Sequence, residues 1–356
     1  MENSLWSDIL MQRSNLPSVV RHLSTTERES IDEAAAFIRN DRPIALIGVA
    51  SAAYACMPAE AYLGRRGRYA SVMCASEALY STPQRLAAAN VVINSRSGET
   101  VEVVKLGRYL RDHDIPFVAI TNEPESTLAT LATHVIRART HKDDLVSINV
   151  VTGMMTATLA LAAAVAGELD DLQPHFEHLA AAMSQCVDTS AAHGSQMLDV
   201  FADVRPVHLL YRGGFRGSAY CGRLVLEEVA RTPGVTLGAA EFRQGPNEVI
   251  DGRFGAVVFV GDGEQGDLNR ALCREIADCG GRVMAITADT SSGFAADDRT
   301  MVVRLPRVQE FLMPVLAVVP LQVLAYRLAE AQGYSPGAVQ FISKVIVREA
   351  GIPNGR

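Results

Sequence analysis

The sequence has 356 residues, 48% of them hydrophobic, and a formal net charge of −7 at pH 7. A chain of this length and apolar content is long enough for two globular domains and is too hydrophobic for a disordered or fibrous protein. Because the net charge is negative, no overall positive field attracts a phosphate backbone, and we expect no nucleic-acid partner.

The first ten residues, MENSLWSDIL, contain neither a basic cluster nor an apolar core, so they lack the pattern of a secretory signal. The most apolar run of the chain, residues 150–166, is short, rich in alanine and interrupted by Thr and Gly, which argues against a membrane span. We therefore expect a cytoplasmic protein without a membrane partner. Residues 1–35 are predicted to form a helical N-terminal arm.

Two parts of the chain share one order of apolar runs, helical segments and Gly-Glu turns. Gly48 matches Gly213 and Gly98 matches Gly263 at the same offset, and Ala119-Ile-Thr121 matches Ala285-Ile-Thr287 at an offset one residue longer. A nearly constant offset of this kind indicates an internal duplication.

Helical patterns follow the apolar runs in both copies, as in residues 101–113 and 267–279. Such alternation is typical of βαβ units and of a parallel sheet with helices on both faces. We therefore predict an α/β protein with two tandem, doubly wound, three-layer domains. The expected boundaries are 1–35 for the arm, 36–190 for the first domain, 191–335 for the second domain and 336–356 for a C-terminal tail.

Ser95-Arg-Ser-Gly-Glu-Thr100 stands between an apolar run and the helix expected from residue 101. Ligands of parallel sheets bind beyond the carboxyl ends of the strands, where helix N-termini offer N–H groups and the positive end of a dipole. Each hydroxyl taken alone is more often a helix cap. Because the hydroxyls of Ser95, Ser97 and Thr100 cluster with a glycine at the start of one helix, we favour a phosphate-binding loop.

The matching turn of the second copy, Gly261-Asp-Gly-Glu-Gln-Gly-Asp267, has no hydroxyl and three acidic groups, which repel a phosphate. We therefore expect one phosphate site per chain. Ser51 and Ala52 follow the first strand, and Ser147 lies just before an expected helix. Each of these serines is either a helix cap or part of the site.

Two further candidates are a glutamate pair and a lysine. Glu227 and Glu228 lie in an expected helix, where neighbouring residues point about 100° apart and most such pairs face solvent. Lys344 precedes residues 345–347, which read as a short strand. An ammonium in an apolar stretch either extends to solvent or serves a site.

The six cysteines form no CxxC pair and have no His at ligand spacing. This pattern argues against a disulfide framework and against a zinc site. We expect no metal and no cofactor.

With these motifs the sequence resembles the double SIS (sugar isomerase) domain family, which includes the isomerase half of glucosamine-6-phosphate synthase and the fructosamine-phosphate deglycases. Ser95-Arg-Ser-Gly-Glu-Thr100 is similar to the Ser-Gln-Ser-Gly-Glu-Thr phosphate loop of that family. Ala240-Glu-Phe-Arg-Gln-Gly-Pro246 is similar to its Gly-Glu-Leu-Lys-His-Gly-Pro element. The resemblance spans nearly the whole chain and implies two flavodoxin-like SIS domains.

The resemblance also implies roles for individual residues. Leu224-Val-Leu-Glu-Glu-Val229 is similar to the family's Leu-Lys-Leu-Lys-Glu-Ile segment, which places Glu228 at the glutamate that moves a proton between sugar carbons one and two. Ser343 and Lys344 resemble the C-terminal Ala-Lys-Ser-Val tail that closes over the sugar. The binding set is then Ser51, Ala52, Ser95, Arg96, Ser97, Thr100, Ser147 and Ser343, and the catalytic set is Glu228, Lys344 and Gln244.

Two positions depart from the family. Gln244 stands where the ring-opening histidine is expected, and an amide is neither a general acid nor a general base near neutral pH. Val225 stands where the synthases carry a lysine. Either another group opens the ring, or the substrate is already open, or the chemistry is weakened. Since the sequence starts Met-Glu without a cysteine nucleophile, we expect no glutamine amidotransferase activity.

The leading hypothesis is an enzyme that isomerises, deaminates or deglycates a phosphorylated sugar or amino-sugar by proton transfer through Glu228. The alternative is a non-catalytic sugar-phosphate sensor, which Gln244 favours. The resemblance implies a homodimer with shared active sites, and residues 311–328 are either a part of its interface or a core helix.

Overall fold

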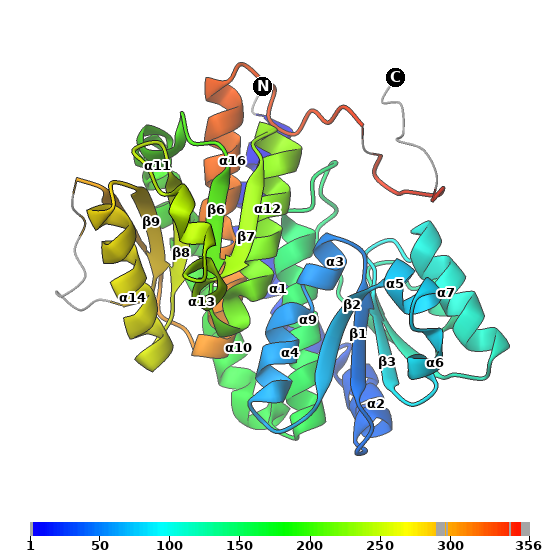
Figure 1. Ribbon diagram of the computed structural model, residues 1–356. Helices are drawn as coiled ribbons and strands as arrows, with labels where there is room; N and C mark the ends of the chain where they lie inside the picture. Colours follow the sequence, from blue (N-terminus) through cyan, green and yellow to red (C-terminus); the bar gives the residue numbers. More distant parts are fainter. Residues whose placement is uncertain (1–2, 290–295, 297, 342, 350–356) are drawn as a thin grey trace. The chain divides into compact units, whose positions relative to one another are not determined.

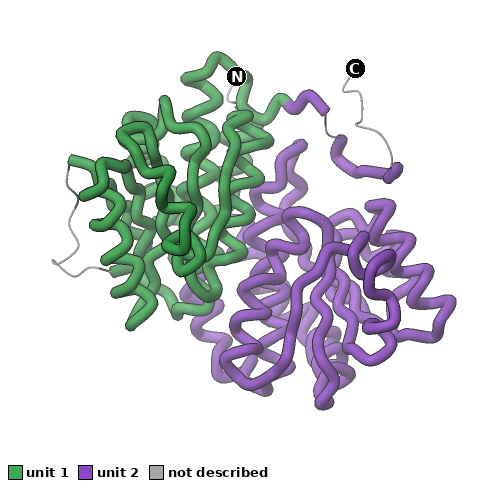
Figure 2. Tube along the Cα trace, in the orientation of Figure 1, with its two compact units in different colours: residues 1–13, 181–338 green, residues 14–180, 339–356 purple. Residues whose placement is uncertain are grey.

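The computed structural model describes residues 3–289, 296, 298–341 and 343–349. The chain divides into two compact units (Figure 2). Unit 2 combines residues 14–180 with 339–356, and unit 1 combines residues 1–13 with 181–338. The division falls within the helices α1 (Ser4–Ser24) and α10 (Leu169–Ala192), so each unit is assembled from segments that are far apart in the sequence.

Unit 2 is built on a five-stranded parallel sheet with the strand order β2-β1-β3-β4-β5. The strands are β1 (Ile44–Gly48), β2 (Ala70–Cys74), β3 (Asn90–Asn94), β4 (Phe117–Thr121) and β5 (His134–Arg137). Every residue of β1, β3 and β4 is buried. Continuous apolar runs are expected in strands that helices cover on both faces.

Helices pack on both faces of this sheet (Figure 1). One face carries α5, α7 and α8 over Ile47 and Val91, and the other carries α4 and α9 over Leu46 and Val92. The helices of unit 2, besides parts of α1 and α10, are α2 (Arg28–Ile38), α3 (Ser51–Tyr54), α4 (Met57–Gly64), α5 (Ala75–Tyr80), α6 (Pro83–Leu86), α7 (Val101–Asp112), α8 (Thr127–Leu131) and α9 (Asn149–Ala166). Unit 2 is therefore a three-layer αβα domain.

Unit 1 repeats this plan with a parallel sheet of order β10-β9-β8-β6-β7. Its strands are β6 (Val207–Tyr211), β7 (Gly234–Gly238), β8 (Gly255–Val260), β9 (Arg282–Thr287) and β10 (Thr300–Arg304). Counted within each unit, both sheets have the order 2-1-3-4-5, which is the flavodoxin-like doubly wound order. The prediction of two doubly wound parallel-sheet domains is confirmed.

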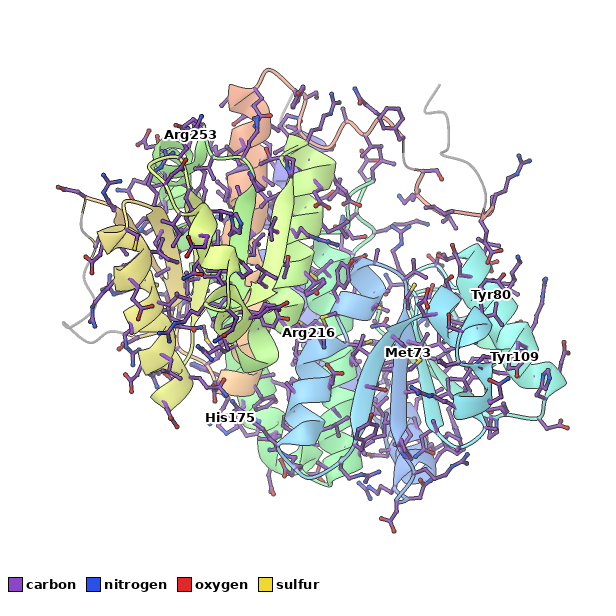
Figure 3. All side chains as sticks on the ribbon, in the orientation of Figure 1. Met73, Tyr80, Tyr109, His175, Arg216 and Arg253 are labelled. Carbon is purple, nitrogen blue, oxygen red and sulfur yellow. The ribbon has the colours of Figure 1, made fainter. Side chains whose placement is uncertain are left out.

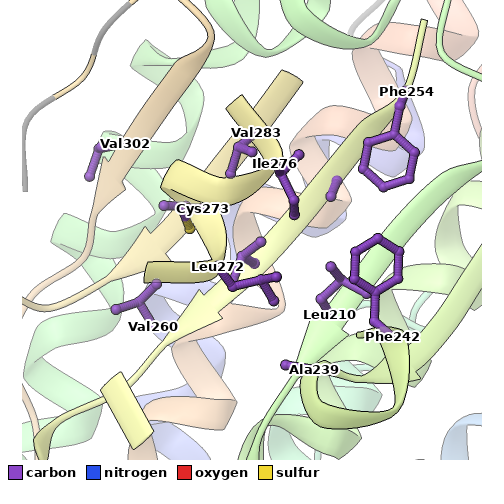
Figure 4. Packing of buried hydrophobic residues seen from close by; sticks show 13 residues of the cluster. Leu210, Ala239, Phe242, Phe254, Val260, Leu272, Cys273, Ile276, Val283 and Val302 are labelled. Carbon is purple, nitrogen blue, oxygen red and sulfur yellow. The ribbon is translucent and has the colours of Figure 1, made fainter. Parts of the chain in front are cut away.

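Aromatic and aliphatic side chains fill one face of the unit 1 sheet (Figure 4). Phe242 and Phe254 stack with their ring centroids 5.7 Å apart, and Leu272 and Ile276 of α14 pack in the same cluster. The helices of unit 1 are α11 (Gly194–Phe201), α12 (Arg216–Ala230), α13 (Ala239–Phe242), α14 (Gly263–Asp278), α15 (Met313–Ala317) and α16 (Val319–Ala331), with 3-10 turns η1 (Gly213–Phe215), η2 (Pro246–Val249) and η3 (Glu310–Leu312).

The strand register refines the repeat. Gly98 and Gly263 both follow the third strand of their sheets and share a φ of 63°. Ile44 of β1 pairs with Asn90 of β3, and Val207 of β6 pairs with Gly255 of β8. The offset in residue number between the two copies is therefore two residues shorter in the first strands than in the third strands. The match of Gly48 with Gly213 was therefore wrong. The residue of unit 2 that corresponds to Gly213 is Ala50.

Two helical segments among the described residues, Asn149–Ala166 and Glu310–Ala331, are long and apolar enough to cross a membrane. However, 94% and 89% of their residues are buried inside the structure, which is typical of core helices in globular units. For residues 311–328 the structure thus favours the core helix over an exposed dimer surface.

Candidate functional site

The end of β1 turns sharply into α3. A Cβ added to Gly48 would lie 2.6 Å from the backbone nitrogen of Ala53, so only glycine allows α3 to pack so close to the strand. Ala50 has φ 48° and ψ −123°, a conformation that costs a non-glycine residue about 1–3 kcal/mol. This strained turn carries Ser51 and Ala52 to the carboxyl end of the sheet.

The loop between β3 and α7 is equally tight. The Ser95 Oγ accepts the N–H of Gly98 at 3.2 Å, and the Ser97 Oγ accepts the N–H of Glu99 at 3.2 Å. Gly98 has φ 63°, and an added Cβ would lie 2.0 Å from the Ser126 Oγ. The glycine is therefore required both for the backbone conformation and for the packing of the loop.

Hydrogen bonds with the end of β4 and the start of α8 hold this loop in place. The carbonyl oxygen of Arg96 accepts hydrogen bonds from the N–H of Asn122 at 3.1 Å and from the Thr121 Oγ1 at 3.0 Å. The Glu99 carboxylate accepts the N–H of Thr127 at 2.6 Å and its hydroxyl at 2.9 Å, at the start of α8. The loop is therefore held in place by protein contacts that leave its hydroxyl side facing outward from the sheet.

The hydroxyls of Ser51, Thr100 and Ser147 do not cap the helices beside them. Thr100 is the N-cap residue of α7, but no side-chain cap bond is made there. The N-cap residue of α3 is Ala50 and that of α9 is Ile148, so neither Ser51 nor Ser147 is a cap. The helix-cap alternative for these serines is thus removed.

The side chain of Asp143 binds the free backbone N–H groups at the start of α9. Its fully buried carboxylate accepts the backbone N–H groups of Ile148, Asn149 and Val150 at 2.8, 3.0 and 2.9 Å. The side-chain amide of Asn149 adds a fourth bond at 2.8 Å. The N-terminal amides of α9 are therefore occupied.

A cavity of about 120 Å³ lies at the carboxyl end of the unit 2 sheet. Its wall includes two cationic residues and five hydroxyl groups, and no Asp or Glu. The residues are Val49, Ser51, Ala52, Asn94, Ser95, Arg96, Ser97, Thr100, Val103, Ser147, Val150, Val151, Met154 and Lys344.

The structure brings together every candidate of the predicted binding set except Ser343. The exposed Ser343 hydroxyl donates to the carbonyl oxygen of Val345 at 2.9 Å and is not part of the cavity wall. Residues 345–347, predicted as a strand, form no regular element. They lie against α7, where the carbonyl oxygen of Ile346 accepts the N–H of Val101 at 3.0 Å.

Asn94 is a cavity residue that the sequence analysis missed. Its side chain is fully buried, and its amide donates to the Thr158 Oγ1 at 3.2 Å and to the Cys56 Sγ at 3.5 Å. Among the described residues, no hydrogen-bond partner reaches the buried Asn94 Oδ1. The signal in the sequence was a polar residue at the end of an otherwise apolar strand.

Arg96 supplies positive charge to the cavity. One terminal nitrogen donates to the carbonyl oxygen of Lys344 at 2.7 Å, and its Nη1 is buried without a partner in the described part of the chain. Burial lowers the pKa of the guanidinium, while Asp143 and Glu123 act in the opposite direction. An arginine remains cationic at neutral pH in any protein environment.

The remaining candidates belong to unit 1. Glu228 lies on α12 and is partly buried, and burial, with a smaller effect of Glu227, raises the pKa of its carboxyl to about 7. Glu227 is exposed and lies 3.9 Å from Arg223, so the two neighbours diverge as expected. Gln244 is exposed in the turn after α13, where its N–H donates to the carbonyl oxygen of Glu241 at 2.9 Å.

The turn of unit 1 that matches the phosphate loop has different chemistry. Asp262 pairs with Arg307 at 3.0 Å, and Arg270 pairs with Asp267 and, at 3.0 Å, with Asp289. Two of its three acidic side chains, Asp262 and Asp267, are thus paired with arginines, and the turn offers no hydroxyl.

Within the described residues, no group of three or more His, Cys, Asp or Glu side chains is placed to hold a metal ion. All six cysteines are free thiols.

Comparison with known proteins supports the fold of both units. Residues 37–164 match the model of the SIS domain. Glutamine–fructose-6-phosphate aminotransferase (isomerizing) from Bartonella quintana (strain Toulouse) is 26% identical over 283 residues, which are 77% of this chain and 47% of that protein. The chain thus spans about half the length of the curated relatives that it matches.

Two solved structures match both units. The C-terminal domain of glucosamine-fructose-6-phosphate aminotransferase from Francisella tularensis has a TM-score of 0.84 at 19% identity, with 94% of this chain and 97% of that chain covered. Glucosamine-6-phosphate deaminase from Thermotoga maritima has a TM-score of 0.79 at 18% identity, with 96% and 99% covered. Residues 37–164 therefore form a SIS domain, in a chain that is homologous to the isomerase domain of glutamine–fructose-6-phosphate aminotransferase.

Proposed function

We propose that this protein is an enzyme that binds a phosphorylated sugar or amino-sugar and moves a proton between its carbons one and two. The observation that carries the binding part is the wall of the unit 2 cavity, which has five hydroxyls and two cations and no carboxylate. A phosphate dianion needs several hydrogen-bond donors and positive charge, which the hydroxyls and the guanidinium of Arg96 supply.

The same wall disfavours other ligand classes. Divalent cations in proteins are commonly held by carboxylates, and none of the lining side chains is acidic. A neutral sugar would leave the guanidinium of Arg96 without a counter-charge in a partly buried position. Val103, Val150 and Met154 provide an apolar wall that suits the carbon face of a sugar.

Glu228 is proposed to carry the proton. A carboxyl group with a pKa of about 7 both accepts and donates a proton near neutral pH, which the transfer between two neighbouring carbons requires. An enediol or enolamine intermediate then connects isomerisation, deamination and deglycation. The matched proteins include a deaminase and isomerizing aminotransferases, which supports this group of reactions.

Lys344 is proposed to hold the carbonyl oxygen of the sugar, on which negative charge develops. Gln244 cannot open a sugar ring by acid–base chemistry, so ring opening is assigned to another group or to an open-chain substrate. No residue of this chain is assigned to glutamine hydrolysis. By resemblance, we propose that the protein is cytoplasmic and forms a homodimer. Sedimentation of the purified protein tests the oligomeric state directly.

A non-catalytic sugar-phosphate sensor is the second candidate. The exposed amide of Gln244 favours it, because a sensor needs the phosphate loop but no ring-opening group. The two candidates differ in turnover and share ligand binding.

Thermal-shift binding is the first test, with fructose 6-phosphate, glucosamine 6-phosphate, arabinose 5-phosphate and fructosamine 6-phosphate, each also offered without its phosphate. We expect at least one phosphorylated member to raise the melting temperature, and Ser97→Ala to lose the shift. The Glu228→Gln variant should keep binding and lose turnover. Binding without turnover in the wild-type protein would favour the sensor, and the absence of any shift would refute the site.

A further inference from the structure

The C-terminal segment 343–349 reaches the phosphate loop through its backbone. The guanidinium of Arg96 donates to the carbonyl oxygen of Lys344 at 2.7 Å, and the N–H of Val101 donates to the carbonyl oxygen of Ile346 at 3.0 Å. These contacts place Lys344 on the cavity wall. A backbone carbonyl is present whatever the side chain, so neither contact explains why this stretch of chain docks here.

A side chain at the end of the segment supplies that specificity. Both carboxylate oxygens of Glu349 accept the hydroxyl of Tyr80, at 2.8 and 3.0 Å, and the ammonium of Lys105 also contacts this carboxylate. Tyr80, labelled in Figure 3, is the exposed last residue of α5, and Lys105 lies one helical turn into α7. The Lys105 and Tyr80 side chains, which are themselves 3.4 Å apart, form one binding point for Glu349.

Apolar burial contributes little to this docking. Ile346 and Val347 remain 37% and 67% exposed, so the segment is held mainly by hydrogen bonds and one ion pair. Lys105 and Tyr80 hold the pKa of Glu349 below its usual range, as expected for a carboxylate that is engaged in its ionised form. The segment is therefore held at three places: Arg96 binds the carbonyl of Lys344, Val101 binds the carbonyl of Ile346, and Tyr80 with Lys105 binds the carboxylate of Glu349.

We propose that Glu349 is a positioning residue: its contact with Lys105 and Tyr80 anchors the C-terminal segment and thereby holds Lys344 at the sugar-binding side of the cavity. This inference rests on the proposed function, because it assigns the sugar contact to Lys344. Glu349 itself does not line the cavity. Its removal should therefore weaken contacts to the sugar while the contacts to the phosphate persist.

Exposed ion pairs with an added hydrogen bond have modest effects, so we expect the undocked population to rise about threefold to tenfold when the carboxylate is lost. The variants are Glu349→Gln, Lys105→Glu and the charge swap Lys105→Glu with Glu349→Lys. The control is Asp32→Asn, which removes one carboxylate from a similarly exposed ion pair with Arg28 on α2.

Two measurements are made on each full-length variant. The first is the rate of trypsin cleavage after Lys344 in brief digests, followed by intact mass. The second is the affinity for inorganic phosphate compared with that for the phosphorylated sugar that gives the largest thermal shift. We expect Glu349→Gln and Lys105→Glu to be cleaved about threefold to tenfold faster and to bind the sugar phosphate more weakly by a similar factor, with phosphate affinity unchanged. The charge swap should restore both.

Three results would overturn the inference. The first is cleavage and affinity of Glu349→Gln equal to those of wild type and Asp32→Asn. The second is an equal loss for inorganic phosphate and sugar phosphate, which indicates a general structural effect. The third is a swap that restores nothing. If the wild-type protein binds neither phosphate nor any phosphorylated sugar, the proposed function itself fails, and that failure is seen before any variant is compared.

Discussion

The two units share a sheet order but differ at the turn where ligands bind. Gly98 in unit 2 and Gly263 in unit 1 have the same φ of 63° at the start of the helix that follows the third strand. The register of the sheets places Ser97 of unit 2 at the position of Asp262 in unit 1, and Arg96 at the position of Gly261. A common backbone therefore carries hydroxyl and cationic groups in one copy and acidic groups in the other.

This difference shows that the doubly wound fold provides the location of a site, whereas side chains decide what binds there. The unit 2 turn has no acidic group on its cavity wall. The unit 1 turn engages its own carboxylates with arginines, such as the pair of Asp262 with Arg307 at 3.0 Å. In unit 1 the candidate for chemistry is instead a proton-transfer group, Glu228, on a different helix.

The largest effect is expected from a pair of glycine substitutions. Gly98→Ala should destabilise the protein by about 4 kcal/mol, because the new Cβ meets Ser126 and the φ is unfavourable. Gly263→Ala should cost only about 1 kcal/mol, since no atom lies within 4 Å of its added Cβ and only the φ penalty remains. Urea denaturation measures both. Equal losses would show that the two loops are packed alike, contrary to the structure.

The second prediction exchanges the chemistry of the turns. Ser97→Asp places in unit 2 the residue type that unit 1 has at this position, and its charge repels a phosphate in the same cavity. We expect the affinity for a phosphorylated ligand to fall about 100-fold or more. The matched control is Asp262→Ser in unit 1, which should leave this affinity unchanged. Calorimetric titration with the sugar phosphate from the thermal-shift panel provides the measurement.

The third prediction concerns the titratable group of unit 1. The pKa of Glu228 is about 7 in the folded protein against a usual value of 4.5, so the protonated carboxyl is the form that folding favours. The resulting stability is present below the unfolded pKa and is lost as the pH rises through about 7.

Glu228→Gln removes this pH dependence. The variant should be more stable than wild type by about 2 kcal/mol at pH 9 and equally stable near pH 4, after allowance for partial solvent screening. Glu227→Gln is the comparison variant, because its carboxyl is exposed and causes only the smaller part of the rise in the Glu228 pKa, so most of the pH dependence should remain. Chemical denaturation across this pH range measures the free energy of unfolding of wild type and of both variants. A constant stability difference between wild type and Glu228→Gln would contradict the raised pKa.

The sequence was sufficient for the parts of the structure that depend on local pattern. Apolar runs and helical segments in alternation predicted both parallel sheets, and the hydroxyl cluster from Ser95 to Thr100 predicted the lining of the cavity. Lys344, a candidate both from its apolar surroundings in the sequence and from the resemblance, also lines the cavity.

Features that depend on how loops and chain ends fold back were out of reach. Asp143 occupies the start of α9 because the loop before that helix folds back on it, and Glu349 meets Tyr80 across most of the chain length. Neither contact leaves a spacing signal. The repeat was also misaligned at its first strand, because Gly48 and Gly213 were matched by residue type, whereas the strand registers of the two sheets make Ala50 the counterpart of Gly213.

The smallest effect follows from that corrected pairing. Ala50 in unit 2 and Gly213 in unit 1 lie in equivalent turns and have φ values of 48° and 56°. Unit 2 therefore has an alanine where unit 1 has glycine, the residue type that a positive φ favours. Ala50→Gly should stabilise the protein by about 1 kcal/mol, because relief of strain exceeds the entropy that glycine adds to the unfolded chain.

The reverse change, Gly213→Ala, should destabilise the protein by a similar amount, and thermal unfolding of both variants measures the pair. Since Ala50 directly precedes Ser51 on the cavity wall, the affinity of Ala50→Gly for the phosphorylated ligand adds a second comparison. A more stable variant with weaker binding would show that the strain helps to present Ser51 to the phosphate. A more stable variant with unchanged binding would show that the Ser51 hydroxyl is presented equally well when residue 50 is a glycine, the residue type that unit 1 has at this position.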